Sequence, residues 1–192
     1  MASGLYIALL HTPVYNKRGE MITTSITNLD LHDISRVART YGVKRYFLVH
    51  PQESQLELAR DMLSYWRSGF GGSYNSDRKE ALKVLDLAVD LKEVKERIIQ
   101  MEGCSPLTIV TDARMFPQSI SYLDLRSQIQ DSAAPFLIMF GTGWGLTREV
   151  IEKADHILFP LESNGDYNHL SVRSAASIIM DRLAGEAWWE PS

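Results

Sequence analysis

The sequence predicts an α/β fold, in which a parallel β-sheet is covered by helices on both faces. Short apolar runs alternate with longer amphipathic segments, which is typical of repeated strand–helix units. Two of the apolar runs, residues 136–140 and 157–159, end in turns rich in glycine, proline and asparagine. Ligands of such sheets bind at the carboxyl ends of the strands. We therefore expect the functional site at those two turns.

The amino-terminal half predicts two strand–helix pairs and a further helix. Its apolar runs are short and continuous, which is typical of buried strands. The segment after the first run places Leu31, Ile34 and Ala38 on one face of a helix. The expected strands are 5–10 and 46–49, and the expected helices are 30–41, 53–66 and 77–85.

Residues 67–78 are expected to form a flexible loop between two helices. They carry three glycines around Phe70 and Tyr74, with arginines at the flanks. Mobility, aromatic faces and positive charge suit an unstacked base or a lid over a substrate, whereas an ordinary surface connection is the alternative. Asp77 is expected to cap the next helix and so to anchor one end of the loop. We take Tyr74 and Arg78 as candidate substrate contacts.

The carboxyl-terminal half continues the alternation. The last helix is expected at residues 170–183, because its apolar residues recur at helical spacing between Ser171 near its start and Gly185 near its end. The other expected helices are 92–101 and 122–130, and the expected strands are 87–89, 107–110, 136–140 and 157–159.

The turns after the last two strands predict a ligand site. Gly141, Gly143 and Gly145 let the backbone take positive φ and approach a ligand closely, although a tight turn without a ligand is the alternative. Pro160 cannot donate to a sheet ladder, so the chain leaves the sheet there. A helix starts soon afterwards, and the free N–H groups of its first turn can bind an adenine edge, a ribose hydroxyl or a carboxylate.

Three motifs resemble those of the SPOUT superfamily of RNA methyltransferases. Residues 140–146 (FGTGWGL) resemble its second motif, and residues 168–176 (NHLSVRSAA) resemble its third. Residues 30–42 are similar to the first motif, with Arg36 six residues before Gly42, where the family has an arginine. The resemblance spans almost the whole chain. It is strongest to a small stand-alone branch that also occurs fused to a tRNA guanine-N1 methyltransferase.

The resemblance implies a carboxyl-terminal trefoil knot, S-adenosylmethionine as the cofactor, and a tRNA or rRNA nucleotide as the substrate. It also implies a homodimer whose interface completes the cofactor pocket. Trp188 and Trp189 are consistent with a dimer, because a monomer would gain little by exposing two large apolar residues. Packing of both side chains on the chain's own core is the alternative. We treat residues 1–192 as one domain of this kind.

Arg36 and Asp30 are the candidate catalytic residues. Arg36 is charged at any relevant pH, so we expect it to bind a phosphate or to polarise the acceptor base; an ordinary surface arginine is the alternative. A general base is expected at Asp30, His32 or His169, although Asp30 could instead cap its helix. The commonest branch has asparagine at the position of Asp30 and an uncharged residue at that of His169. These departures leave open which atom is methylated.

The resemblance also implies cofactor contacts in the second and third motifs and at the end of the strand between them. Trp144, in the glycine turn, could pack on adenine or on a dimer partner. The expected cofactor contacts are Phe140, Gly141, Thr142, Gly143, Gly145, Leu158, Pro160, Leu161, Asn168, Leu170, Ser171 and Ala175. The candidate substrate contacts are Tyr15, Asn16, Arg39, Tyr74 and Arg78.

Composition is consistent with one substantial core and gives no global sign of a nucleic-acid binder. The chain has 192 residues, 45% of them hydrophobic, and its 20 basic and 24 acidic side chains leave a net charge of −4. An RNA substrate therefore has to meet a local basic patch. A single cysteine, Cys104, excludes an intrachain disulfide, and the histidines lack metal-ligand spacing, so we expect no metal. Without a signal-peptide pattern or a membrane-spanning run, the chain is expected to be cytoplasmic.

Two other functions remain open. A non-catalytic module that binds RNA or a nucleotide could keep the fold and the dimer, and Asp30 in place of asparagine favours it. A dinucleotide-dependent oxidoreductase is disfavoured, because no G-x-G-x-x-G follows the first strand and the turn at 141–145 lacks the third spacing.

Overall fold

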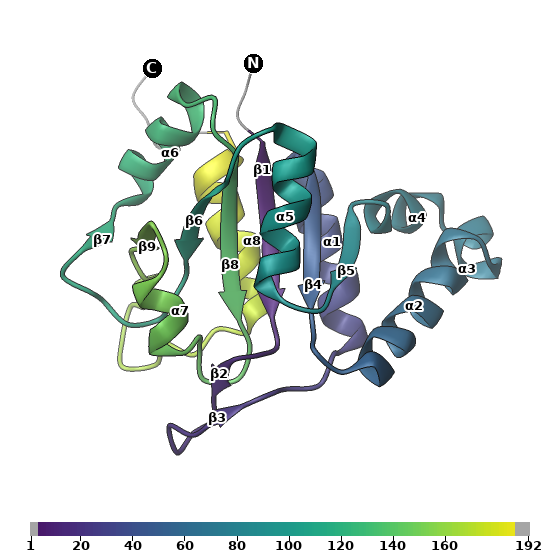
Figure 1. The fold of residues 1–192 in the computed structure, drawn as a ribbon, viewed down its shortest axis with the longest axis horizontal. Helices are drawn as coiled ribbons and strands as arrows, with labels where there is room; N and C mark the ends of the chain where they lie inside the picture. Colours follow the sequence, from purple (N-terminus) through teal and green to yellow (C-terminus); the bar gives the residue numbers. More distant parts are fainter. Residues whose placement is uncertain (1–3, 187–192) are drawn as a thin grey trace.

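The computed structural model describes residues 4–186, and its centre is a seven-stranded sheet with helices on both faces (Figure 1). The order across the sheet is β5-β4-β1-β8-β6-β9-β7, and each neighbouring pair is parallel. The predicted α/β class with a parallel sheet is therefore confirmed. The strands of this sheet are β1 (Leu5–Leu10), β4 (Arg45–Val49), β5 (Leu85–Ala88), β6 (Leu107–Val110), β7 (Ser119–Ile120), β8 (Phe136–Gly141) and β9 (His156–Leu158).

The helices divide between the two faces and bury two apolar cores. Successive residues of β1 alternate between them: Ile7 and Leu9 belong to one core, and Tyr6 and Ala8 to the other. The first core is covered by α1 (Asn28–Thr40), α2 (Glu53–Arg67), α4 (Ser76–Leu82), α6 (Tyr122–Asp131) and α8 (Val172–Ala184). The second is covered by α5 (Leu91–Glu102) and α7 (Arg148–Glu152). Strands buried on both faces explain the continuous apolar runs of the sequence.

The prediction of a flexible loop at residues 67–78 is wrong. Helix α2 runs to Arg67, a short helix α3 spans Phe70–Tyr74, and α4 begins at Ser76. The glycines provide close packing instead of mobility, since a Cβ at Gly71 would lie 2.5 Å from Cε1 of Tyr65. The cap of α4 is also not Asp77: the side chain of Asn75 accepts the N–H of Arg78.

Several short elements were not anticipated. A hairpin of β2 (Val14–Tyr15) and β3 (Met21–Ile22) follows β1 and lies outside the main sheet. Helix α7 and strand β7 were also missed, and the third strand lies at Leu85–Ala88 where 87–89 was expected. Two- to five-residue elements carry too few residues for a period to emerge.

The strand order reverses between β1 and β8. From β1 the chain proceeds outward through β4 to β5, and α5 then carries it across to β6 on the other side. Such a reversal of strand order is where open α/β sheets bind their ligands. Leu10 of β1 pairs with Gly141 of β8, so the first predicted ligand turn starts at this point of reversal.

Some expectations stay predictions at this level. The trefoil knot and the single-domain extent are not tested by strand order, and Trp188 and Trp189 lie outside the described residues. Within residues 4–186, no helix combines the length and apolarity of a membrane span, and no group of three acidic, histidine or cysteine side chains is placed to hold a metal. Cys104 is exposed and unpaired.

Candidate active site

The glycine turn after β8 is held by the β2–β3 hairpin. The N–H of Tyr15 donates to the carbonyl of Gly145 at 2.9 Å, and the N–H of Trp144 donates back to the carbonyl of Tyr15 at 2.8 Å. Gly143 and Gly145 have φ of +59° and +95°, as the sequence predicted, whereas Gly141 does not. A Cβ at Gly143 would lie 2.7 Å from the Tyr15 carbonyl oxygen. Both the backbone conformation and the close approach therefore require glycine at residue 143.

The second turn follows β9 and leads into α8. The side-chain amide of Asn168 donates to the carbonyl of Leu161 at 3.0 Å, which closes the turn. Ser171 caps α8, because its hydroxyl accepts the N–H of Ser174 at 3.2 Å. Leu158 and Leu161 are buried, whereas Leu170 is half exposed. The last helix thus begins beside this turn, although at Val172, two residues later than expected.

The two turns lie side by side. Strands β8 and β9 are separated only by β6, and the rings of Trp144 and His169 are 5.7 Å apart in an edge-on arrangement. Asp112, two residues after β6, lies against the first turn: a Cβ at Gly145 would be 3.3 Å from its Oδ2. Arg114 holds the same carboxylate through two hydrogen bonds of 2.9 Å each. Sequence reasoning missed Asp112, because a lone aspartate after a strand carries no distinctive pattern.

The side chains at these turns suit S-adenosylmethionine. Trp144 and Leu170 are 52% and 49% exposed and offer apolar surface for an adenine ring, while the turns supply backbone donors and acceptors. The carboxylate of Asp112 offers an acceptor for ribose hydroxyls and for the cationic end of the cofactor. The chemistry of the site therefore fits the group that the resemblance implies.

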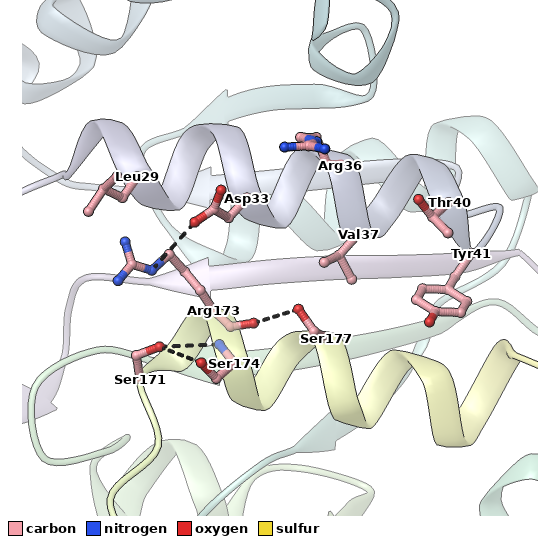
Figure 2. Close-up of a pocket in the computed structure, with 10 residues that line it drawn as sticks. All are labelled: Leu29, Asp33, Arg36, Val37, Thr40, Tyr41, Ser171, Arg173, Ser174 and Ser177. Atoms are coloured by element: carbon pink, nitrogen blue, oxygen red, sulfur yellow. Dashed lines mark hydrogen bonds and ion pairs between the residues drawn. The ribbon is translucent and has the colours of Figure 1, made fainter. Parts of the chain in front are cut away.

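An open groove of about 690 Å³ lies between α1 and α8 and joins the first and third motifs (Figure 2). Arg36 comes from α1, on the edge of the helix away from α8, whereas Arg173 reaches from α8 toward α1. The lining residues are Leu29, Asp33, Arg36, Val37, Thr40, Tyr41, Ser171, Arg173, Ser174 and Ser177. The structure thus brings Arg36, a candidate catalytic residue, and Ser171, an expected cofactor contact, to one groove.

Asp30 links the start of α1 to α8. The N-cap of α1 is Thr27, so capping by Asp30, the alternative that the sequence left open, is wrong; the Asp30 carboxylate instead accepts the Thr27 hydroxyl at 2.6 Å. The guanidinium of Arg173 lies 3.8 Å from both Asp30 and Asp33. Burial raises the pKa of Asp30, while Thr27 and Arg173 act in the opposite direction. The ion pairs of Arg173 with Asp30 and Asp33 were not predicted, although Arg173 lies within the third motif.

The candidate substrate residues fall into two groups. Tyr15 lies at the glycine turn, where its hydroxyl accepts the N–H of Arg148 at 3.3 Å, and Asn16 closes its own turn by accepting the N–H groups of residues 18 and 20. Arg39, Tyr74 and Arg78 gather on the α1–α4 side. There Arg39 pairs with Glu80 at 3.3 Å, Tyr74 is 82% exposed, and Arg78 stacks over Trp66 at 4.7 Å.

A chain of buried hydrogen bonds, which we call the polar relay, connects His11, His50 and Thr24 to Thr142 in the glycine turn. His11 and His50 follow β1 and β4, and both rings are buried. Nδ1 of His11 is 3.0 Å from the hydroxyl of Thr24, which also contacts the hydroxyl of Thr142 in the glycine turn. The hydroxyl of Thr142 in turn donates to the carbonyl of Leu10 at 3.3 Å. The relay therefore ties the segment before α1 to the predicted cofactor turn.

The hydrogen-bond directions assign the protons of the relay. Because Thr142 donates to a carbonyl, it accepts from Thr24, and Thr24 then accepts from Nδ1–H of His11. Nε2 of His11 is left as a buried lone pair without a partner among residues 4–186. In His50, Nδ1 accepts the N–H of Gln52, so Nε2 carries the proton and donates to the Thr24 carbonyl. Both imidazoles are thus arranged as neutral rings.

The relay makes the fold sensitive to acid. Burial, followed by the neighbouring His50, lowers the pKa of His11 from 6.5 to about 4. Because the unfolded chain binds this proton first, stability is lost as the pH falls below 6.5. Between pH 7 and pH 5 the parent is expected to lose about 2 kcal/mol more unfolding free energy than His11→Asn, whose amide can occupy the Nδ1 position. Urea unfolding at both pH values measures this, and identical pH dependence would contradict it.

Comparison with known proteins places the chain in a family. Residues 4–185 match the model of a family described as SAM-dependent RNA methyltransferase. An uncharacterized protein of Aquifex aeolicus is 43% identical over 93% of this chain and 87% of its own length. A protein of Oleidesulfovibrio alaskensis named tRNA (guanine-N(1)-)-methyltransferase is 40% identical over 95% of this chain, which spans only 42% of that relative.

The fold is likewise shared. The solved structure of a TrmH/SpoU tRNA modifying enzyme from A. aeolicus has a TM-score of 0.54 and 14% identity, with 96% of this chain and 75% of that chain covered. The SPOUT-like sheet that the motifs predicted is thereby confirmed. The family match extends over nearly the whole described chain and includes both turns and the α1–α8 groove. The chain therefore belongs to the S-adenosylmethionine-dependent RNA methyltransferase family.

Proposed function

We propose that this protein methylates a nucleotide of tRNA or rRNA and works as a homodimer. The observation that carries the proposal is the meeting of the two turns at the carboxyl edge of the sheet, joined by Thr24 and the hairpin to the start of α1, the helix of Arg36. Since RNA substrates of this kind are met in the cytoplasm, the proposal places the protein there.

The predicted contacts of the two turns are proposed to hold the cofactor. S-adenosylmethionine, when bound, supplies an electrophilic methyl group. Trp144 and Leu170 pack against the adenine. The backbone at Phe140, at Leu158, in the glycine turn and at residues 160 and 161 bonds its polar edge. Asp112 is added to these contacts, because its carboxylate lies against Gly145 and can accept from a hydroxyl or a cation. The remaining contacts are those that the motifs predicted at Gly141, Thr142, Gly143, Gly145, Asn168, Leu170, Ser171 and Ala175.

Arg36 and Asp30 are proposed to act on the acceptor nucleotide. Arg36 forms no ion pair with any carboxylate of residues 4–186, so its guanidinium is available for a phosphate or a base. Burial raises the pKa of Asp30, which makes its carboxylate a better proton acceptor than an exposed aspartate. The chain then contributes mainly by holding the two reactants in line.

The homodimer is supported by the groove between α1 and α8. Its lining exposes apolar surface, with Leu29 57% exposed. A second copy seated there would bury this surface and bring another α1 to the third motif. Sedimentation of the purified protein should then give twice the chain mass of 21.8 kDa.

Transfer of a labelled methyl group from S-adenosylmethionine to unmodified tRNA and to ribosomal RNA tests the reaction. The proposal predicts label in one of these RNAs and none in DNA. A non-catalytic module is the second candidate. It is favoured because the carboxylate of Asp30 already accepts the Thr27 hydroxyl and pairs with Arg173. Saturable binding of both S-adenosylmethionine and RNA without any transfer of label would establish that alternative.

A further inference from the structure

The helices beyond the β5 edge carry an unusual group of exposed aromatic rings. Helices α2, α3 and α4 project from the body of the molecule at the edge where β5 ends the sheet (Figure 1). Tyr65, Phe70 and Tyr74 are 50%, 71% and 82% exposed. We name these three side chains the aromatic ledge. Exposed large rings gathered in one place are more typical of a binding surface than of bare protein surface.

Glycines give the ledge a fixed shape. A Cβ at Gly69 would lie 2.8 Å from the carbonyl oxygen of Tyr65, and one at Gly71 would lie 2.8 Å from the ring of Trp66. Only residues without a side chain therefore let α3 lie this close to the end of α2. As a result Phe70 and Tyr74, four residues apart on α3, present their rings outward on one side, 6.2 Å apart and nearly parallel at 20°.

Positive charge accompanies the ledge. Among residues 4–186, Arg78 and Lys79 of α4 form no ion pair with a carboxylate, whereas Arg39 and Lys83 are both held by Glu80. Lys79 lies next to α3, since its Cδ would be 3.2 Å from a Cβ at Gly72. Unpaired cations beside open ring faces are the combination that binds single-stranded nucleic acid.

The ledge is continuous with the candidate catalytic arginine. The guanidinium of Arg78 lies over the ring of Trp66, and that ring is 5.1 Å from His32 on α1. Arg36 follows His32 by four residues on α1 and so lies on the same side of that helix. An RNA strand can therefore follow one line of cations from α4 to Arg36.

We propose that the aromatic ledge binds unpaired bases of the RNA substrate next to the target nucleotide, with Phe70 and Tyr74 stacking on the bases and Arg78 and Lys79 on the phosphates. The inference rests on the proposed RNA methyltransferase function and specifies the form of its substrate. A duplex keeps its base faces stacked inside the helix, so the ledge selects a single-stranded loop or end.

Binding of defined oligonucleotides tests the ledge. The probes are a fluorescein-labelled 12-nucleotide oligouridine and a 12-base-pair RNA duplex, titrated by anisotropy with the dimer or monomer as purified. The double variant Phe70→Ala/Tyr74→Ala should weaken binding of the single strand at least about tenfold, since stacking contributes roughly 1–3 kcal/mol per base. Binding of the duplex should change less than about twofold.

Matched variants separate stacking from other causes. Tyr74→Phe keeps the ring and should bind as the parent does. Leu123→Ala removes a side chain of α6 that is 58% exposed, on the far side of the sheet order from β5, and should also leave binding unchanged. Lys79→Gln should lower the slope of log affinity against log salt by about 1, whereas the double aromatic variant should leave that slope as it is.

Any of four other results would contradict the proposed role of the ledge. These are single-strand affinity unchanged in the double variant, an equal loss on the duplex, no single-strand binding by the parent, or a change in sedimenting mass that marks the rings as a protein interface. Calorimetry with S-adenosylmethionine keeps this failure distinct from failure of the proposed function. Parent and variants that bind cofactor and RNA alike refute only the ledge, whereas a parent that binds neither refutes both.

Discussion

Replacing Gly143 by valine is expected to weaken S-adenosylmethionine binding at least about tenfold while the protein stays folded. At φ of +59° a β-branched residue is strained, and its Cβ would lie 2.7 Å from the carbonyl oxygen of Tyr15. The turn must therefore separate from the hairpin that shapes it. Because Trp144 and Tyr15 share the adjoining hydrogen bonds, the displacement spreads along the predicted cofactor contacts.

A matched glycine isolates the effect of the turn from that of lost stability. Gly103, at the end of α5, has φ of +77° but no atom within 4 Å of an added Cβ. Gly103→Val thus carries backbone strain without the close approach and far from the two turns. Calorimetric titration should show weak cofactor binding in Gly143→Val and parental binding in Gly103→Val, with the melting temperature lowered in both. Parental affinity in Gly143→Val would place the cofactor elsewhere.

Arg36→Ala is expected to reduce methyl transfer by at least about a hundredfold while cofactor affinity stays within about twofold of the parent. Arg36 pairs with no carboxylate of the described chain, so its loss removes no ion pair and costs little stability. Its guanidinium is proposed to contact the acceptor nucleotide and not the cofactor. The loss should therefore appear in the transfer of label.

Two companion variants test the reason for the effect. Arg36→Lys keeps a charge but loses the planar fork, so it should restore only part of the rate if the contact is bidentate. Arg60→Ala removes an exposed arginine of α2 that pairs with Glu53, and it should leave transfer unchanged. Parental rates in Arg36→Ala would remove Arg36 from the reaction.

The sheet was predictable because strands buried on both faces read as unbroken apolar runs. Residues 5–10 and 107–110 were placed as the structure has them, and helix 53–66 was one residue short. The positive φ of Gly143 and Gly145 was also predictable, since the turn follows a strand and glycine adopts that conformation more readily than any other residue.

The errors came where packing between elements decides the structure. Glycines 69, 71 and 72 indicated a mobile loop, yet they serve to seat α3 against Tyr65 and Trp66, which no local pattern reveals. Likewise Thr27 caps α1 and leaves Asp30 for Arg173, a partner more than a hundred residues away. Local propensity ranks possible caps but cannot choose among them.

The site itself was predictable only in part. The two turns and Arg36 carry motifs, so the sequence alone could nominate them. The relay of His11, Thr24 and Thr142 could not be found in that way, because its hydroxyl contact joins residues 118 positions apart. Asp112 was hidden for the same reason, since its relation to Gly145 exists only once β6 and β8 are neighbours.

Calorimetric titration of the purified protein with S-adenosylmethionine, with NAD as the control ligand, tests the central claim most directly. The two turns predict saturable binding of S-adenosylmethionine with one site per chain and no binding of NAD. Absence of saturable S-adenosylmethionine binding, both alone and with RNA present, would contradict the assignment of these turns as a cofactor site, as would binding of NAD in its place.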